Sequence, residues 1–93
     1  MLEKVKKMLN ITSEYMNDVI GLWIDETVRF MCDAGVDKRV AMSDYAVGVV
    51  ARGVADLYDF GSGSGSFSPH FKSSVVQLSL LTDDQISEIL KNV

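Results

Sequence analysis

The sequence predicts an all-α protein built on two long antiparallel helices, at about residues 13–34 and 44–60, with short helices toward both termini. Two observations predict this fold class. In the first segment apolar residues recur every three or four positions, which places them on one face of an α-helix and not along a strand. The second segment, YAVGVVARGVADLYDF, repeats that spacing and contains no proline.

The first long helix has signals at both ends and a clear buried stripe. Thr12 and Ser13 offer side-chain oxygens for the first free amides, and Gly35 can adopt the left-handed conformation that ends a helix. The stripe includes Trp23, which we expect to be buried between the two long helices. Tyr15 and Leu22 project beside that stripe. They indicate either a wide buried face within one chain or a contact with a second chain.

The second long helix is rich in valine, so tertiary packing has to hold it in place. Ser43 or Asp44 is expected to cap its start. Gly48, Ala51 and Ala55 form a narrow strip of small residues that would let another helix approach closely. We expect that neighbour to be the first long helix.

The first 42 residues contain two lesser elements. Residues 2–9 predict a short helix whose lysines, Lys4, Lys6 and Lys7, favour a solvated face over a phosphate-binding patch. Residues 36–42 are expected to form a helical turn or a loop.

The last third of the chain begins with a Gly-Ser run at residues 61–66, predicted to be a flexible loop. Ser68 before Pro69 predicts the start of a helix that extends to Leu81. Thr82 and Gln85 have the spacing of a capping box, so residues 82–93 are expected to form a C-terminal helix or tail.

Length and composition indicate one small domain that associates with other chains. The 93 residues are 47% hydrophobic, more than so small a surface-rich domain is expected to bury by itself. We therefore expect an oligomer. The net charge of −4 opposes binding to nucleic acid, and a single cysteine, Cys32, fits a reducing cytoplasm. No apolar run approaches the length of a membrane span, so we expect a soluble intracellular protein.

No catalytic residue, cofactor site or metal site is predicted. His70 and Cys32 are the only residues of their kinds, and we interpret both as structural. The Gly-Ser run lacks the Gly-Lys-Ser/Thr ending of a phosphate-binding loop. A DNA-reading helix would present several basic or amide side chains, whereas the helix at 44–60 offers Arg52 alone. The protein is therefore not expected to be an enzyme or a sequence-specific DNA-binding protein.

The order of several segments resembles a known family. The chain opens with MLEKVKKMLNIT, its first long helix ends in DAGV, and SDYAVGVVARGVADLYDFG and VVQLSLL follow. This layout, over residues 1–81, is similar to the small head–tail connector proteins of long-tailed phages, which are also described as phage DNA-packaging proteins.

The resemblance implies a structural adaptor without enzymatic activity or membrane contact. Such a protein assembles as a homo-oligomeric ring, for example a dodecamer, on the phage portal protein after DNA packaging. It then binds the next head-completion or tail protein. DNA would pass through the lumen without sequence-specific binding, and an acidic wall would repel it. The protein would be made in the cytoplasm of the bacterial host and would lie at the head–tail interface of the virion.

Candidate interface residues come from the two flank residues of the first helix and from the segment after the Gly-Ser run. That segment carries apolar anchors with little following sequence to bury them. The candidates are Tyr15, Leu22, Phe67, Phe71, Val75, Leu78, Ile86 and Ile89. A different interpretation is a small helical regulatory or antitoxin-like module that binds one soluble partner. A ring adaptor would form a closed assembly, whereas a regulatory module would be a monomer or dimer.

Overall fold

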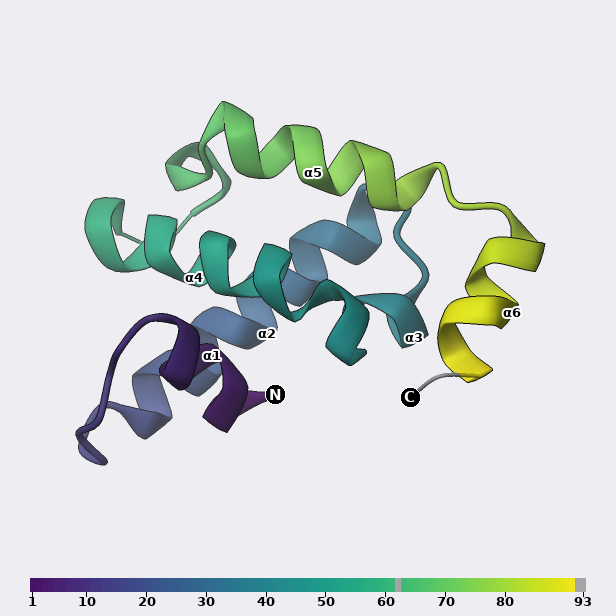
Figure 1. Ribbon diagram of the computed structural model, residues 1–93. Helices are drawn as coiled ribbons and strands as arrows, with labels where there is room; N and C mark the ends of the chain where they lie inside the picture. Colours follow the sequence, from purple (N-terminus) through teal and green to yellow (C-terminus); the bar gives the residue numbers. More distant parts are fainter. Residues whose placement is uncertain (62, 92–93) are drawn as a thin grey trace.

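Helices α2 and α4 pack against each other and form the centre of the protein, as Figure 1 shows for the computed structural model. The structure describes residues 1–61 and 63–91. Within these residues the chain forms helices and no strands, which confirms the all-α prediction. The α-helices are α1 (Leu2–Met8), α2 (Asn17–Asp33), α3 (Lys38–Ala41), α4 (Val47–Phe60), α5 (Pro69–Ser79) and α6 (Asp83–Lys91). Two 3-10 turns, η1 (Asp44–Ala46) and η2 (Ser64–Ser66), precede α4 and α5.

The remaining helices surround this pair. In Figure 1, α2 and α4 run in opposite horizontal directions, with α4 in front. Helix α1 packs against both of them, and α5 lies along α4 on its other side. Helix α6 stands at the far end of the molecule, turned away from the direction of α5, and contacts α3.

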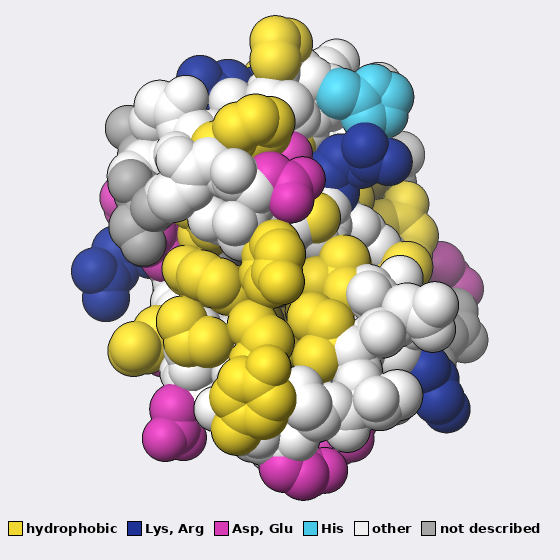
Figure 2. All heavy atoms as spheres, turned by 90° about the vertical axis from the view of Figure 1, so that its left-hand side faces the viewer, with side chains coloured by type: hydrophobic (Ala, Val, Ile, Leu, Met, Phe, Trp, Pro, Cys, Tyr) yellow, Lys and Arg dark blue, Asp and Glu magenta, His cyan; other side chains and the backbone are white. Residues whose placement is uncertain are grey.

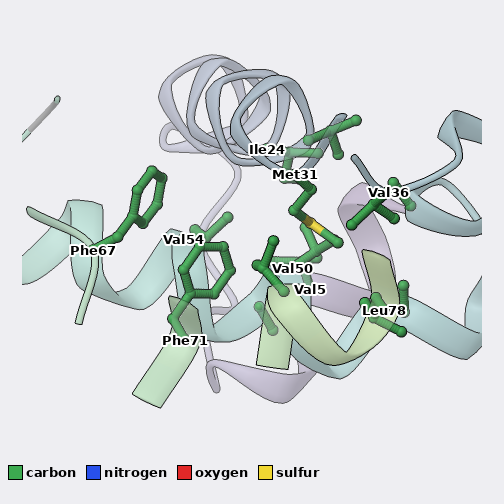
Figure 3. Packing of buried hydrophobic residues seen from close by; sticks show 14 of the residues in the cluster. Val5, Ile24, Met31, Val36, Val50, Val54, Phe67, Phe71 and Leu78 are labelled. Atoms are coloured by element: carbon green, nitrogen blue, oxygen red, sulfur yellow. The ribbon is translucent and has the colours of Figure 1, made fainter. Parts of the chain in front are cut away.

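The hydrophobic core lies where α2, α4 and α5 meet, as Figure 3 shows. Met31 of α2, Val54 of α4 and Phe71 of α5 are fully buried there. Val5 of α1 and Leu78 near the end of α5 extend the core toward its edges. Val40 and Ala41 of α3 are also buried in it, so the core draws on five of the described helices.

Helix α2 begins later than predicted. Thr12 and Ser13 precede a turn, and the residue that caps α2, Met16, makes no side-chain cap bond. Lys6 is buried, and its Nζ donates a hydrogen bond of 2.6 Å to Oδ1 of Asn17, the first helical residue. The expected solvated face of α1 is therefore wrong for Lys6. This bond joins residues eleven positions apart, and no local sequence pattern predicts it.

The start of α4 also differs from the prediction. A 3-10 turn occupies Asp44–Ala46, and the Ser43 hydroxyl donates to the Val40 carbonyl at 2.6 Å instead of capping the helix. The small residues Gly48, Ala51 and Ala55 were expected to face the first long helix, but Gly48 does not face α2. A Cβ placed on Gly48 would lie 3.6 Å from Cε of Met8, which belongs to the neighbouring end of α1.

Local capping signals are confirmed where they involve only neighbouring residues. The Ser68 hydroxyl accepts the Phe71 amide at 3.2 Å, and Pro69 is the first residue of α5. Thr82 and Gln85 form both bonds of a capping box, at 2.8 and 3.2 Å. Gly35, after α2, has the positive φ of 104° that a side chain would disfavour.

The Gly-Ser segment forms a hydrogen bond with α2. The Gly63 amide donates to Oε2 of Glu26 at 2.8 Å. Ser62 of the predicted flexible loop and residues 92–93 of the predicted C-terminal helix lie outside the described residues.

Candidate interaction surface

Four of the candidate interface residues are part of the core. Phe67, Phe71, Val75 and Leu78 are buried. Phe30 of α2 contributes to an aromatic cluster with two of them: the ring centroids of Phe30 and Phe67 are 4.7 Å apart, as are those of Phe67 and Phe71. The expectation that this segment lacks sequence to bury it is therefore wrong, because α4 and Phe30 cover it. In this arrangement these four residues are not accessible to a partner.

The other four candidates lie at the surface but not together. Tyr15 and Leu22 are 87% and 66% exposed, near the beginning and in the middle of the α2 region. Ile86 and Ile89 lie on α6, which buries none of its residues. Both are half-buried, and Ile86 packs against the edge of the core. The structure thus brings no complete set of the candidates onto one surface.

A continuous apolar surface does exist, on the face formed by α1, α2 and the end of α4. Figure 2 shows apolar side chains gathered across the middle of this face, the left-hand side of Figure 1. They line three shallow hollows. Two of the hollows share lining residues, and the third is connected to them by the contact between the rings of Trp23 and Tyr58. We call these residues the apolar strip: Met8, Leu9, Ile11, Val19, Leu22, Trp23, Ala55 and Tyr58.

Trp23 and Tyr58 join the two halves of the apolar strip. Their ring centroids are 5.7 Å apart and the rings meet edge to face at 75°, a favourable geometry for aromatic pairs. Trp23 is half-buried and Tyr58 is 54% exposed. The prediction that Trp23 is buried between the long helices is therefore wrong. The buried face of α2 consists of Ile20, Ile24, Thr27, Val28 and Met31. Trp23 lies at the edge of this face.

Charged residues border both ends of the apolar strip. Asp25 and Arg29 line the hollow on α2, and Arg52 and Asp59 line the hollow between α1 and α4. All four are exposed, and none forms an ion pair within residues 1–61 and 63–91. Asp59 also lines the hollow beside Tyr58, so the apolar side chains of this surface lie among charges of both signs.

Sequence reasoning missed most of the apolar strip. Of the eight residues of the apolar strip, only Leu22 was among the candidate interface residues. The excess of apolar residues correctly indicated that some would remain exposed. It carried no information on where they would gather, because that depends on how α1 and α4 meet.

The described residues include one cysteine and one histidine. Cys32 is partly exposed on α2, and His70 is exposed in the first turn of α5. No group of three or more His, Cys, Asp or Glu side chains within the described ranges could hold a metal ion. The three hollows along the apolar strip, of about 340 to 460 Å³, are open at the surface. None of the described helices is long and apolar enough to cross a membrane.

Asp37 and Arg39 form a close ion pair at the start of α3. The Arg39 guanidinium donates to both carboxylate oxygens of Asp37, at 3.1 and 2.9 Å, and the Arg39 amide donates at 2.8 Å. These bonds lower the pKa of Asp37 below its ordinary value. Asp37 thereby caps α3, which is a structural role.

Comparison with known proteins gives no relative for this chain. No protein-family model matches it, and no curated protein or solved structure is detectably similar.

Proposed function

We propose that this protein is a structural head–tail connector of a tailed phage. In this function it assembles as a ring on the portal after DNA packaging and then binds the next head-completion or tail protein. The proposal rests on the order of sequence segments that resembles this family, over residues 1–81. The antiparallel pair of α2 and α4 would form the frame of each subunit.

One structural observation supports an assembly role above others. Met8, Leu22 and Tyr58 of the apolar strip are exposed, and the other five residues of the strip are only half-buried. Exposed apolar surfaces that cross several elements mark sites of protein association, whereas scattered apolar residues do not. Trp23 and Tyr58, near the middle of the strip, are residue types that often dominate binding energy.

The charge of the chain is compatible with a channel for DNA. At −4, a ring of subunits would multiply the negative charge around its lumen. A negative wall repels phosphate groups and lets DNA slide without binding.

The direct genetic test begins with gene neighbourhood. The gene is expected to lie close to genes for a portal protein, a terminase and a capsid protein. Inactivating it should leave heads filled with DNA but without tails, and the wild-type gene supplied in trans should restore infectious particles. Normal tailed particles from the inactivated phage would contradict the proposal. A neighbourhood that holds one small soluble partner and no virion genes would instead favour the regulatory or antitoxin-like module.

A further inference from the structure

The connection between α4 and α5 is anchored in the core by one aromatic ring. Among those of residues 61–67 whose exposure the structure describes, only Phe67 is buried, with 4% of its surface exposed. Its ring stacks on Phe71 of α5 and contacts Phe30 of α2, with 4.7 Å between the ring centroids in both cases (Figure 3). Phe30 and Phe71 thus form an aromatic seat that the ring of Phe67 fills.

Two carboxylates hold the connection on either side of this ring. The Gly63 amide donates a hydrogen bond of 2.8 Å to Oε2 of Glu26, and the Ser68 amide donates one of 3.0 Å to Oδ2 of Asp56. Glu26 belongs to α2 and Asp56 to α4, so the connection is bonded to both central helices. The first bond is exposed and the second is only partly buried, so water can replace both of them.

The turn η2 joins the two bonded ends of the connection. The Ser66 amide donates to the Gly63 carbonyl at 3.0 Å, and the Ser66 hydroxyl donates to the Phe60 carbonyl at 3.3 Å. Because Phe67 follows this turn directly, its ring cannot leave the seat unless the turn moves with it. Gly65 has no positive φ, and a Cβ added there would meet nothing within 4 Å. It therefore provides backbone freedom that the closed arrangement does not require, which favours opening.

We propose that residues 63–67 form a latch, which opens as one unit while the α-helices stay folded. Opening breaks the two carboxylate–amide bonds together and lifts Phe67 out of its seat. The rings of Phe30 and Phe71 then face the solvent and form an aromatic surface that is hidden in the closed form. This inference goes beyond the proposed function, because the latch lies within a single chain and needs no portal.

Hydrogen exchange of the full chain, followed by NMR at low urea concentrations, tests the latch. The amides of Gly63 and Ser68 should exchange through one common opening. That opening should be more frequent than the one that exposes the Val54 amide of α4, and it should depend less on urea because it exposes less surface. Unprotected amides at both positions, or exchange of both only through global unfolding, would overturn the proposal.

Replacing one carboxylate tests whether the two bonds open together. Asp56→Ala should speed the exchange of the Ser68 amide roughly tenfold or more, and that of the Gly63 amide by the same factor. Asp59→Ala is the matched control on α4, because the Asp59 side chain is exposed and has no bonding partner among the described residues. It should change neither amide. Faster exchange at Ser68 alone would show that the bonds break independently, and there would be no latch.

The reciprocal change acts from the other side of the ring. Glu26→Ala should speed the exchange of both amides, by a smaller factor because its bond is exposed. Asp25→Ala, at the neighbouring and exposed position of α2, should leave both unchanged. An effect of Glu26→Ala on Gly63 alone would contradict the latch.

Removal of the ring itself separates a latch from a core element. Phe67→Ala should keep the helical circular dichroism of the wild type and should increase the fluorescence of added anilinonaphthalene sulfonate, which reports exposed apolar surface. Phe60→Ala is the control, since Phe60 lies at the other end of the connection and is 70% exposed. It should change neither signal. A Phe67→Ala protein that unfolds, or one that binds no more dye than Phe60→Ala, would overturn the proposal.

Discussion

Gly53 of α4 and Thr27 of α2 approach so closely that no room remains for a Cβ between them. A Cβ built on Gly53 would lie 2.5 Å from Cγ2 of Thr27 and 2.8 Å from Cε1 of Phe71. Real Cβ atoms essentially never come within 3.0 Å of such neighbours. The glycine therefore allows α2, α4 and α5 to meet at one point of the core.

Replacing Gly53 by alanine should destabilise the protein. Overpacking of a dense core costs about 1–3 kcal/mol, which exceeds the ~1 kcal/mol that alanine gains over glycine in helix propensity. Gly21→Ala is the matched control, because Gly21 also lies within a helix and a Cβ there would meet nothing within 4 Å. It should raise the free energy of unfolding by about 0.5–1 kcal/mol. Urea unfolding of both variants decides the matter, and a Gly53→Ala protein as stable as the wild type would contradict the packing described.

Phe71 should matter more to stability than Trp23, although tryptophan is the larger residue. Phe71 is fully buried, so Phe71→Ala should cost about 3–5 kcal/mol. Trp23 is half-buried against Tyr58, so Trp23→Ala should cost only about 1–2 kcal/mol. Thermal unfolding followed by circular dichroism compares the two. Equal losses would show that Trp23 is a core residue after all.

The features of the fold that the sequence predicted correctly depend on residues close together in the chain. Helical spacing gave the all-α class, and the capping signals at Ser68 and Thr82 involve partners three residues away. The sequence did not predict that α2 begins only at Asn17, or that the side chain of Asn17 bonds Lys6, eleven positions earlier.

The sequence also could not rank the two glycines of α4. Gly48 faces Met8 of α1, whereas Gly53 faces Thr27 of α2, and only the packed structure separates them. The prediction of the interface residues was partly wrong for the same reason. Phe67 and Phe71 were predicted to be interface residues, but in the structure they are buried and their rings contact Phe30.

Acid should weaken the cap of α3. The pKa of Asp37 is lowered in the folded protein, mainly by its side-chain hydrogen bonds with Arg39, from an ordinary value of 3.8. The stabilisation is therefore fully present above pH 3.8 and is lost as the pH falls through the lower folded pKa. Because both side chains are at the surface, the effect should be small and reduced by salt. Asp37→Asn should remove this part of the acid dependence of stability. A carboxyl titration by NMR that places Asp37 above its ordinary pKa would contradict this account.

Removal of residues 82–93 should leave the rest of the protein folded. Helix α6 buries none of its residues and contacts mainly α3, so the core of Met1–Leu81 stays complete without it. We expect a cooperative melting transition close to that of the full chain, together with weaker attachment to the portal or to neighbouring subunits. Truncation after Gly61 is the control, because it also removes Phe67 and Phe71 and should unfold the protein. A shortened Met1–Leu81 that does not fold would assign α6 to the core.

The most direct test of a connector function is binding to the portal protein encoded in the same genome. The two proteins are co-expressed, purified through a tag on the portal, and imaged by electron microscopy. We predict a complex in which a ring of this protein lies on one end of the portal ring, coaxial with its channel. Tyr58→Glu, measured beside Val76→Glu at a similarly exposed position of α5, would show whether the apolar strip takes part in that assembly. A folded protein that remains separate from an intact portal, in every form and at high concentration, would contradict the proposed function.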